Sequence, residues 1–334
     1  MARLSPPSKR IILLILISAA SNSLILILTV DERTGAVLKD VEPVFLGLFA
    51  GIWLATLSFD ATSIVMFTRG TDENISILRA MRIATLRIFF NIITPFGFGG
   101  QPFAVVSLTR EGIPPGKGSS IVVIKLVTLS IVVQLGALIS FTLYHRQIET
   151  MGFVRIFFLI ASFVGAAVTA LIIIGFRYPK LLIRGLTWIG QLLHSVRLLK
   201  SSENLKRRII REAALARKSF RLYFLLGTGF NCVAYAGQLL LLYAILRGLG
   251  IEVPLSDSLV LGTILLFLIM FMPTPGAIGF AEAFFLILYA RVVPTYLLGV
   301  ALILWRFFYH YLSALFGAVS SSQYVTGLIV DRTK

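Results

Sequence analysis

The chain has 334 residues, of which 57% are hydrophobic and only 14% are charged, so it lacks the polar surface that a water-soluble domain of this length needs. Its formal net charge is +16, but the basic residues flank apolar runs. This pattern argues against nucleic-acid binding and favours attraction to anionic lipid headgroups. One cysteine, Cys232, and three widely separated histidines predict no disulfide framework, no metal site and no cofactor.

Apolar runs of about 20 residues, each long enough to cross about 30 Å of hydrocarbon, predict an all-α polytopic membrane protein. The first run follows Lys9 and Arg10, and we expect an uncleaved span over 10–30. The small residues at 18–20 leave a cleaved signal peptide as the alternative. About six spans are expected in all, the others covering residues 43–68, 119–144, 153–176, 219–246 and 296–320.

Two further apolar segments, 78–109 and 258–291, are interrupted by proline and glycine. The interruptions read TPFGFGGQP at 94–102 and PTPGAIGFAE at 273–282. Proline removes a backbone donor, and backbone facing lipid must be hydrogen-bonded within its own segment. Such breaks are therefore typical of half-helices that line a polar site inside the bilayer. Because neither arm is long enough to span, each segment is expected to form a re-entrant hairpin that returns to its own side.

The positive charges predict the orientation of the chain in the cell's inner (cytoplasmic) membrane. With both termini in the cytoplasm, the cytoplasmic segments hold 23 of the 31 Lys and Arg residues and the external segments hold six. In this topology residues 43–144 and 219–320 form two inverted repeats within a single membrane domain of residues 1–334. Thr94 and Thr274 then correspond at an offset of 180, and Lys125 and Arg306 at 181.

Residues 177–221 form the one sizeable polar segment and hold twelve of the basic residues. Their pattern predicts an amphipathic helix on the cytoplasmic surface. Two roles are open for it: an anchor that also sets orientation, or a binding surface for anionic headgroups.

Ionised side chains within the expected spans are the strongest site candidates, because charge is costly in a bilayer. Glu282 would cap the returning half-helix of the second hairpin, or serve as a proton or cation site. Arg306 would pair with Glu282 or Asp60, or contact a lipid phosphate. Lys125 lies near enough to the start of its span to reach the interface, and Asp60 would pair with a cation or belong to a proton path.

Polar and glycine residues at the breaks complete the candidate site. The half-helices after the breaks would direct free N–H groups inward and so favour anions, and Arg87 adds a further donor nearby. No nucleophile elbow, metal motif or Walker-type loop is present, which favours a protein that is not an enzyme. The candidate substrate-binding residues are Arg306, Glu282, Lys125, Asp60, Gln101, Asn91, Thr94, Gly99, Gly100, Thr274, Gly276 and Gly279.

The two breaks and Arg306 resemble the flippase-like membrane family related to the membrane region of lysylphosphatidylglycerol synthase, the multiple peptide resistance factor. Its members carry a second turn of the form Pro-x-Pro-Gly-Gly-x-Gly-x-x-Glu and an Arg in the last span. Here Ala277 replaces the second Gly of that turn, and Gln101 stands where Glu is common in the first. The resemblance covers about 40–325 and implies a bacterial or archaeal protein that handles lipids or lipid-linked precursors. The synthase's aminoacyl-transferring domain is not expected, so only lipid translocation is implied.

Three functions follow from these observations. The first is a translocase that moves an anionic or polyprenyl-linked lipid headgroup between leaflets. The second is a lipid-binding accessory subunit of a membrane glycosyl- or aminoacyltransferase, with 177–221 as its docking face. The third is a secondary transporter of a small soluble anion.

Overall fold

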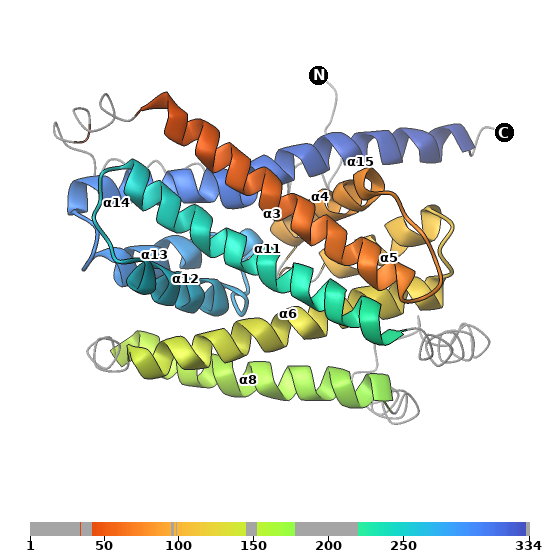
Figure 1. Cartoon of the computed structure of the whole chain (residues 1–334), viewed down its shortest axis with the longest axis horizontal. Coiled ribbons are helices and arrows are strands. Elements are labelled where there is room, and N and C mark those ends of the chain that lie inside the picture. The colour runs from red at the N-terminus through yellow and green to blue at the C-terminus, as the bar shows by residue number, and fades with distance from the viewer. Residues whose placement is uncertain are drawn as a thin grey trace, which may run out of the picture.

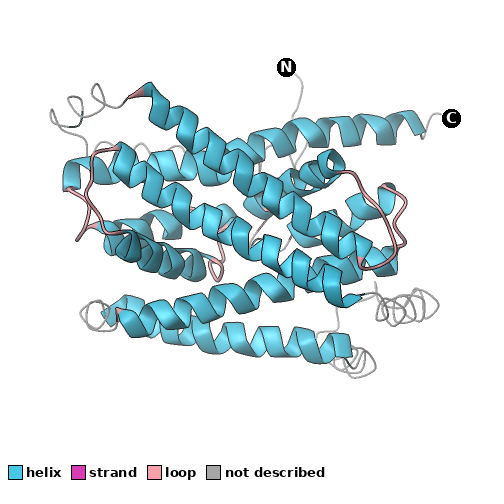
Figure 2. Cartoon of the chain, in the orientation of Figure 1, coloured by secondary structure: helices cyan, strands magenta, loops and turns pink. Residues whose placement is uncertain are grey.

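A computed structural model describes residues 34, 42–94, 97, 99–144, 152–177 and 220–331 (Figure 1). Figure 2 shows helices joined by short loops, with no strand in these ranges. The elements are α3 (Pro43–Arg69), α4 (Ile77–Ile93), α5 (Gly100–Arg110), α6 (Pro115–Leu143), α8 (Gly152–Arg177), α11 (Phe220–Gly248), α12 (Leu255–Ile269), the short turn η3 (Pro275–Ala277), α13 (Phe280–Tyr289), α14 (Thr295–Arg306), the π-helical turn η4 (Phe307–Tyr311) and α15 (Leu312–Asp331). The predicted all-α polytopic fold is confirmed.

Five of the expected spans appear as helices long and apolar enough to cross a membrane. They are Pro43–Arg69, Pro115–Leu143, Gly152–Ile174, Arg221–Gly248 and Thr295–Ser321, the last running through α14, η4 and α15. The expected span over 10–30 lies outside the described residues. Of the basic segment 177–221, only residues 177, 220 and 221 are described.

Prolines mark the starts of several of these helices. Pro43 and Pro115 occupy the first helical position of α3 and α6, where a missing N–H costs nothing. Pro254 and Pro294 immediately precede α12 and α14. Proline therefore ends one segment and begins the next in this chain.

Both predicted breaks are present, and each divides its segment into two short helices that pack on each other. Helix α4 ends at Ile93, Thr94 is extended with φ −117° and ψ 144°, and α5 begins at Gly100. Helix α12 ends at Ile269, and α13 begins at Phe280 after η3. The α12–α13 hairpin lies at one end of the long helices and α5 lies at the opposite end (Figure 1).

Small residues allow the long helices to approach closely, as is usual inside membranes. A Cβ atom at Gly237 of α11 would clash with Thr56 of α3, and one at Gly227 would come within 2.8 Å of Phe67. On the other side of the molecule, Gly317 of α15 lies directly against the Thr85 carbonyl of α4. These contacts hold α11 against α3 and α15 against α4.

The tip of the second break reaches the end of the first hairpin's longer arm. A Cβ atom at Gly276 would lie 3.3 Å from Cγ2 of Ile92, two residues before α4's C-cap at Thr94. The two broken segments, nearly 180 residues apart in sequence, therefore meet in the interior.

Candidate functional site

Three ionised side chains from three helices form the first charge cluster, which comprises Asp60, Arg87 and Lys125. The Asp60 carboxylate bridges the two cations: Oδ2 lies 3.0 Å from Arg87 Nη2, and Oδ1 lies 2.9 Å from Lys125 Nζ. The side chains of Asp60 and Arg87 are each 13% exposed, and that of Lys125 is 8% exposed. With two cations and one carboxylate, the cluster carries a net charge of +1.

Lys125 points into the protein instead of reaching for the membrane surface. Its ammonium donates to the Ser63 hydroxyl, to Asn231 Oδ1 at 3.0 Å and to the Asp60 carbonyl at 3.3 Å. The Asn231 amide is held in turn, because its Nδ2 donates to the Lys125 carbonyl and to Thr128 Oγ1. The expectation that Lys125 reaches the interface was wrong, because acceptors from α3 and α11 compensate its charge inside.

The first charge cluster lies well inside the spanning helices α3 and α6, away from their ends. Asp60 precedes the end of α3 at Arg69 by nine residues, and Lys125 follows the start of α6 at Pro115 by ten. At about 1.5 Å of rise per residue, both lie roughly 14–15 Å from those helix ends. The ionised side chains are therefore about three helical turns from the nearer helix ends.

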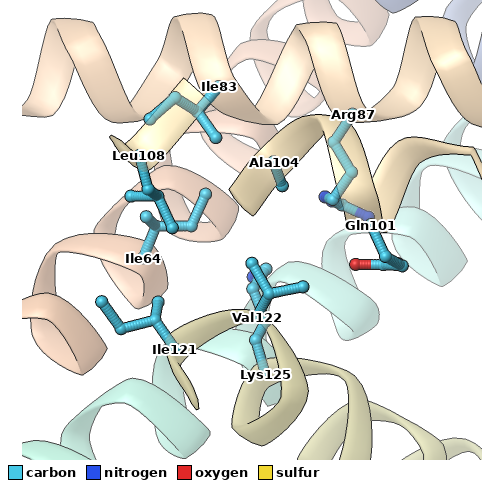
Figure 3. Close-up of a pocket in the computed structure, with 9 residues that line it drawn as sticks. All are labelled: Ile64, Ile83, Arg87, Gln101, Ala104, Leu108, Ile121, Val122 and Lys125. Atoms are coloured by element: carbon cyan, nitrogen blue, oxygen red, sulfur yellow. The ribbon is translucent and has the colours of Figure 1, made fainter. Parts of the chain in front are cut away.

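A small pocket opens beside this cluster, between the first hairpin and the spans α3 and α6 (Figure 3). Arg87, Lys125 and Gln101 contribute its polar lining, and the Gln101 amide oxygen points into it. Its free volume of about 10 Å³ is the room of roughly one water molecule. Arg87 Nε is buried and has no hydrogen-bond partner among the described residues. The remaining lining residues are Ile64, Ile83, Ala104, Leu108, Ile121 and Val122.

The second charge cluster consists of Glu282 and Arg306, with His310 beside them. Glu282 Oε1 accepts from Arg306 Nε at 2.9 Å and Nη2 at 2.8 Å. Glu282 Oε2 accepts from the Gly279 amide at 2.7 Å, so this carboxylate both caps α13 and pairs with a cation. The cap expected for Glu282 and its pairing with Arg306 are therefore present together.

The Arg306 guanidinium binds the backbone of the second break. Its Nη1 donates to the Gly276 carbonyl at 3.1 Å and lies 3.3 Å from His310 Nδ1, and its Nη2 lies 3.4 Å from the Ala277 carbonyl. With the Glu282 contacts, every guanidinium nitrogen has a partner, and the residue is 1% exposed. Arg306 is therefore occupied by the second break.

The contacts of Arg306 explain why the second turn tolerates an alanine. Gly276 and Ala277 have φ of +58° and +54°, in the left-handed region that costs an L-residue about 1–2 kcal/mol. Both carbonyls accept from Arg306, which fixes this conformation. Ala277 can therefore stand where the family's turn has its second Gly, at a modest cost in conformational free energy.

The glycine amides at the starts of the returning half-helices are already occupied. Gly99 N–H donates to Thr94 Oγ1 at 2.9 Å, and Gly100 N–H donates to Asn91 Oδ1 at 3.0 Å. The Gly279 amide is taken by Glu282, and the Thr274 hydroxyl donates to the Ile278 carbonyl. The prediction of free anion-binding amides at these glycines was therefore wrong, because nearby side chains cap them.

The structure thus divides the candidate residues into two groups. Asp60, Lys125 and Gln101 gather at the pocket, together with Arg87, which the sequence suggested only as an additional donor. Arg306, Glu282, Asn91, Thr94, Gly99, Gly100, Thr274, Gly276 and Gly279 shape the breaks. Ser63 and Asn231 were missed, although a lone asparagine within an apolar span was a usable signal.

Replacement of Gly100 by alanine should lower stability by about 1–3 kcal/mol, because the interior is already filled at this position. A Cβ atom there would overlap Asn91 Oδ1 and the Arg87 carbonyl. Gly47 is the matched control, since a Cβ atom at this helical position meets nothing within 4 Å. Thermal unfolding of the purified variants should show a clear loss for Gly100→Ala and none for Gly47→Ala; equal behaviour would contradict the close packing of the first break.

Comparison with known proteins agrees with this architecture. A family model described as the lysylphosphatidylglycerol synthase TM region matches residues 11–317, which include both breaks and both charge clusters. No curated protein matches the chain. The matched region covers most of the 334 residues, and the chain belongs to the lysylphosphatidylglycerol synthase TM-region family.

Proposed function

We propose that this protein is a lipid translocase, which moves an anionic or polyprenyl-linked lipid headgroup between the leaflets of the cytoplasmic membrane. The observation that carries the proposal is the first charge cluster, which has a net positive charge, lies within the spanning helices and contributes Arg87 and Lys125 to the wall of a pocket. Buried charge in a membrane is costly and usually marks a substrate or ion path. Membership of a membrane family related to lipid synthesis supports the same reading.

In this proposal the two clusters have different tasks. Arg87 and Lys125 supply the positive charge that attracts the headgroup phosphate, while Glu282 and Arg306 keep the second break in shape. The fatty or polyprenyl tails stay in lipid, and the chain alters no covalent bond. The two hairpins belong to inverted repeats with both termini in the cytoplasm, so that the polar path can open from each face in turn.

The pocket holds about one water molecule, so translocation needs a wider conformation. Helix α5 is the element best suited to move, because it has only 11 residues and supplies Gln101, Ala104 and Leu108 to the pocket wall. Its link to α4 lies between Ile93 and Gly100 and contains the extended Thr94. Opening of the first hairpin would expose the first charge cluster to headgroups of the nearer leaflet.

The test is headgroup movement in reconstituted vesicles, measured with fluorescent-headgroup lipids and an impermeant quencher. Arg87→Gln should slow movement by about tenfold or more, because one of two cations at the pocket is lost. Arg79→Gln is the matched control: Arg79 pairs with Glu111 at 3.1 Å, but its side chain is 61% exposed. Arg79→Gln should retain the wild-type rate.

Other outcomes would identify other functions. Equal rates in empty vesicles and in vesicles with the wild-type protein would reject the translocase. Uptake of a water-soluble anion without lipid movement would support a small-anion transporter. Co-purification with a membrane transferase, again without lipid movement, would support an accessory subunit.

A further inference from the structure

We propose that the pocket beside the first charge cluster selects a phosphate group that carries a single negative charge, and that Asp60 sets this limit. The inference rests on the proposed function for the nature of the cargo. It deepens that function by naming the recognised group as a phosphodiester, in preference to a phosphomonoester or a diphosphate.

The first step is the charge of the site. Arg87 and Lys125 supply two positive charges and Asp60 one negative charge, and no further carboxylate pairs with these cations within the described residues. In a poorly polarisable interior, one uncompensated positive charge favours one negative charge from a ligand. A phosphodiester neutralises the cluster, whereas a dianionic phosphate leaves an excess negative charge beside Asp60.

The second step is that Asp60 stays in place when a ligand binds. Each of its carboxylate oxygens contacts a different cation at 3.0 Å or less. Lys125 is held independently by Ser63 and Asn231, so it keeps its position and continues to hold Asp60. The carboxylate is therefore a permanent member of the site, and its charge counts in every bound state.

The third step is that a donor remains free for the ligand. Arg87 uses Nη2 for Asp60, while its buried Nε has no partner among the described residues. Gln101 enters the same pocket from α5 (Figure 3). A guanidinium can bind a carboxylate along one edge and a phosphate oxygen along another, so Arg87 can join the ligand to the fixed pair of Asp60 and Lys125.

The experiment compares two lipids with identical tails, phosphatidylglycerol and phosphatidic acid, at about pH 8.5, where a phosphomonoester is largely dianionic. Binding of each to the full-length protein in detergent is measured by displacement of a tail-labelled phosphatidylglycerol. The wild type should prefer phosphatidylglycerol by about tenfold. Asp60→Asn, which raises the cluster to +2, should reverse the order and bind phosphatidic acid more tightly.

Two variants control for charge and for general effects. Asp60→Glu keeps the charge and should keep the wild-type preference. Glu73→Gln makes the same carboxylate-to-amide change at the partly exposed Lys117–Glu73 pair and should leave the ratio of affinities unchanged. Equal affinity of the wild type for the two lipids would overturn the proposal even if Asp60→Asn failed to fold. An unchanged order in a folded Asp60→Asn would overturn it as well.

Two further measurements are needed. One distinguishes a lipid headgroup from a soluble phosphodiester, and the other distinguishes failure of the translocase proposal from failure of the proposal about Asp60. Displacement by unlabelled phosphatidylglycerol but not by free glycerophosphoglycerol assigns the site to a lipid headgroup; displacement by both assigns it to soluble phosphodiesters as well. Displacement by neither would overturn the proposal. Charge preference without lipid movement in vesicles would retract the translocase alone, and lipid movement without charge preference would retract only the role of Asp60.

Discussion

Arg306→Ala should lower the free energy of unfolding by about 3–5 kcal/mol, the cost of leaving one member of a buried ion pair uncompensated. Glu282 would lose both guanidinium contacts, at 2.8 and 2.9 Å, in a site where Arg306 is 1% exposed. The carbonyls of Gly276 and Ala277 would lose their donors at the same time. Denaturant or thermal unfolding of the detergent-purified protein, followed by far-ultraviolet circular dichroism, measures the loss.

Matched variants show whether the loss comes from these contacts of Arg306. Arg306→Lys keeps the charge but has no planar fork, so it should lose about 1–3 kcal/mol. The double replacement Glu282→Gln and Arg306→Gln leaves no buried charge and should be more stable than Arg306→Ala. Arg79→Ala removes an arginine from a largely exposed pair and should change little. Similar stability of Arg306→Ala and Arg79→Ala would contradict this role of Arg306.

The helices and breaks were predictable from the sequence because their causes are local. A run of about 20 apolar residues has few options besides spanning. Proline and clustered glycine interrupt a helix wherever they occur, and α4 ends at Ile93, just before the Thr94-Pro95 pair. The hairpins expected over 78–109 and 258–291 appear as Ile77–Arg110 and Leu255–Tyr289, within a few residues.

The pairing of charges was not predictable, because it depends on how helices pack. The sequence offered Arg306 as a possible partner of Asp60 and otherwise left its cation open, and only the close approach of α3 to α4 and α6 selects Arg87 and Lys125. The approach of α11 to α3 depends on glycines such as Gly237, which carry no sequence signal of their partner. Asn231 joins the site through that contact alone.

The capping of the first break was hidden for a related reason. Asn91 Oδ1 accepts from an amide nine residues later, and Thr94 Oγ1 from one five residues later. These spacings differ from the two- or three-residue spacing of ordinary helix caps. The glycine amides therefore looked free, and an anion site was expected where side chains complete the turn.

Lys125→Met should reduce lipid movement by about a hundredfold, since it removes a buried cation at the pocket. The cluster would become neutral, with Arg87 still paired to Asp60 at 3.0 Å, so the attraction for a phosphate would be lost. Stability should fall by about 1–3 kcal/mol: methionine fills the space of lysine and Asp60 keeps Arg87 as its counter-ion, but Asp60 Oδ1, Ser63 and Asn231 each lose a partner. Vesicle assays and thermal unfolding of the same preparation measure both quantities.

Lys117→Met is the control on the same helix. Lys117 pairs with Glu73 at 2.7 Å near the start of α6, where its side chain is 23% exposed, so lipid movement should stay near the wild-type rate. The two charge clusters then have opposite signatures: Arg306→Ala mainly costs stability, and Lys125→Met mainly costs transport. If Lys125→Met moved lipid as fast as Lys117→Met, the first charge cluster would be another structural ion pair, and the polar path would have to be sought elsewhere in the chain.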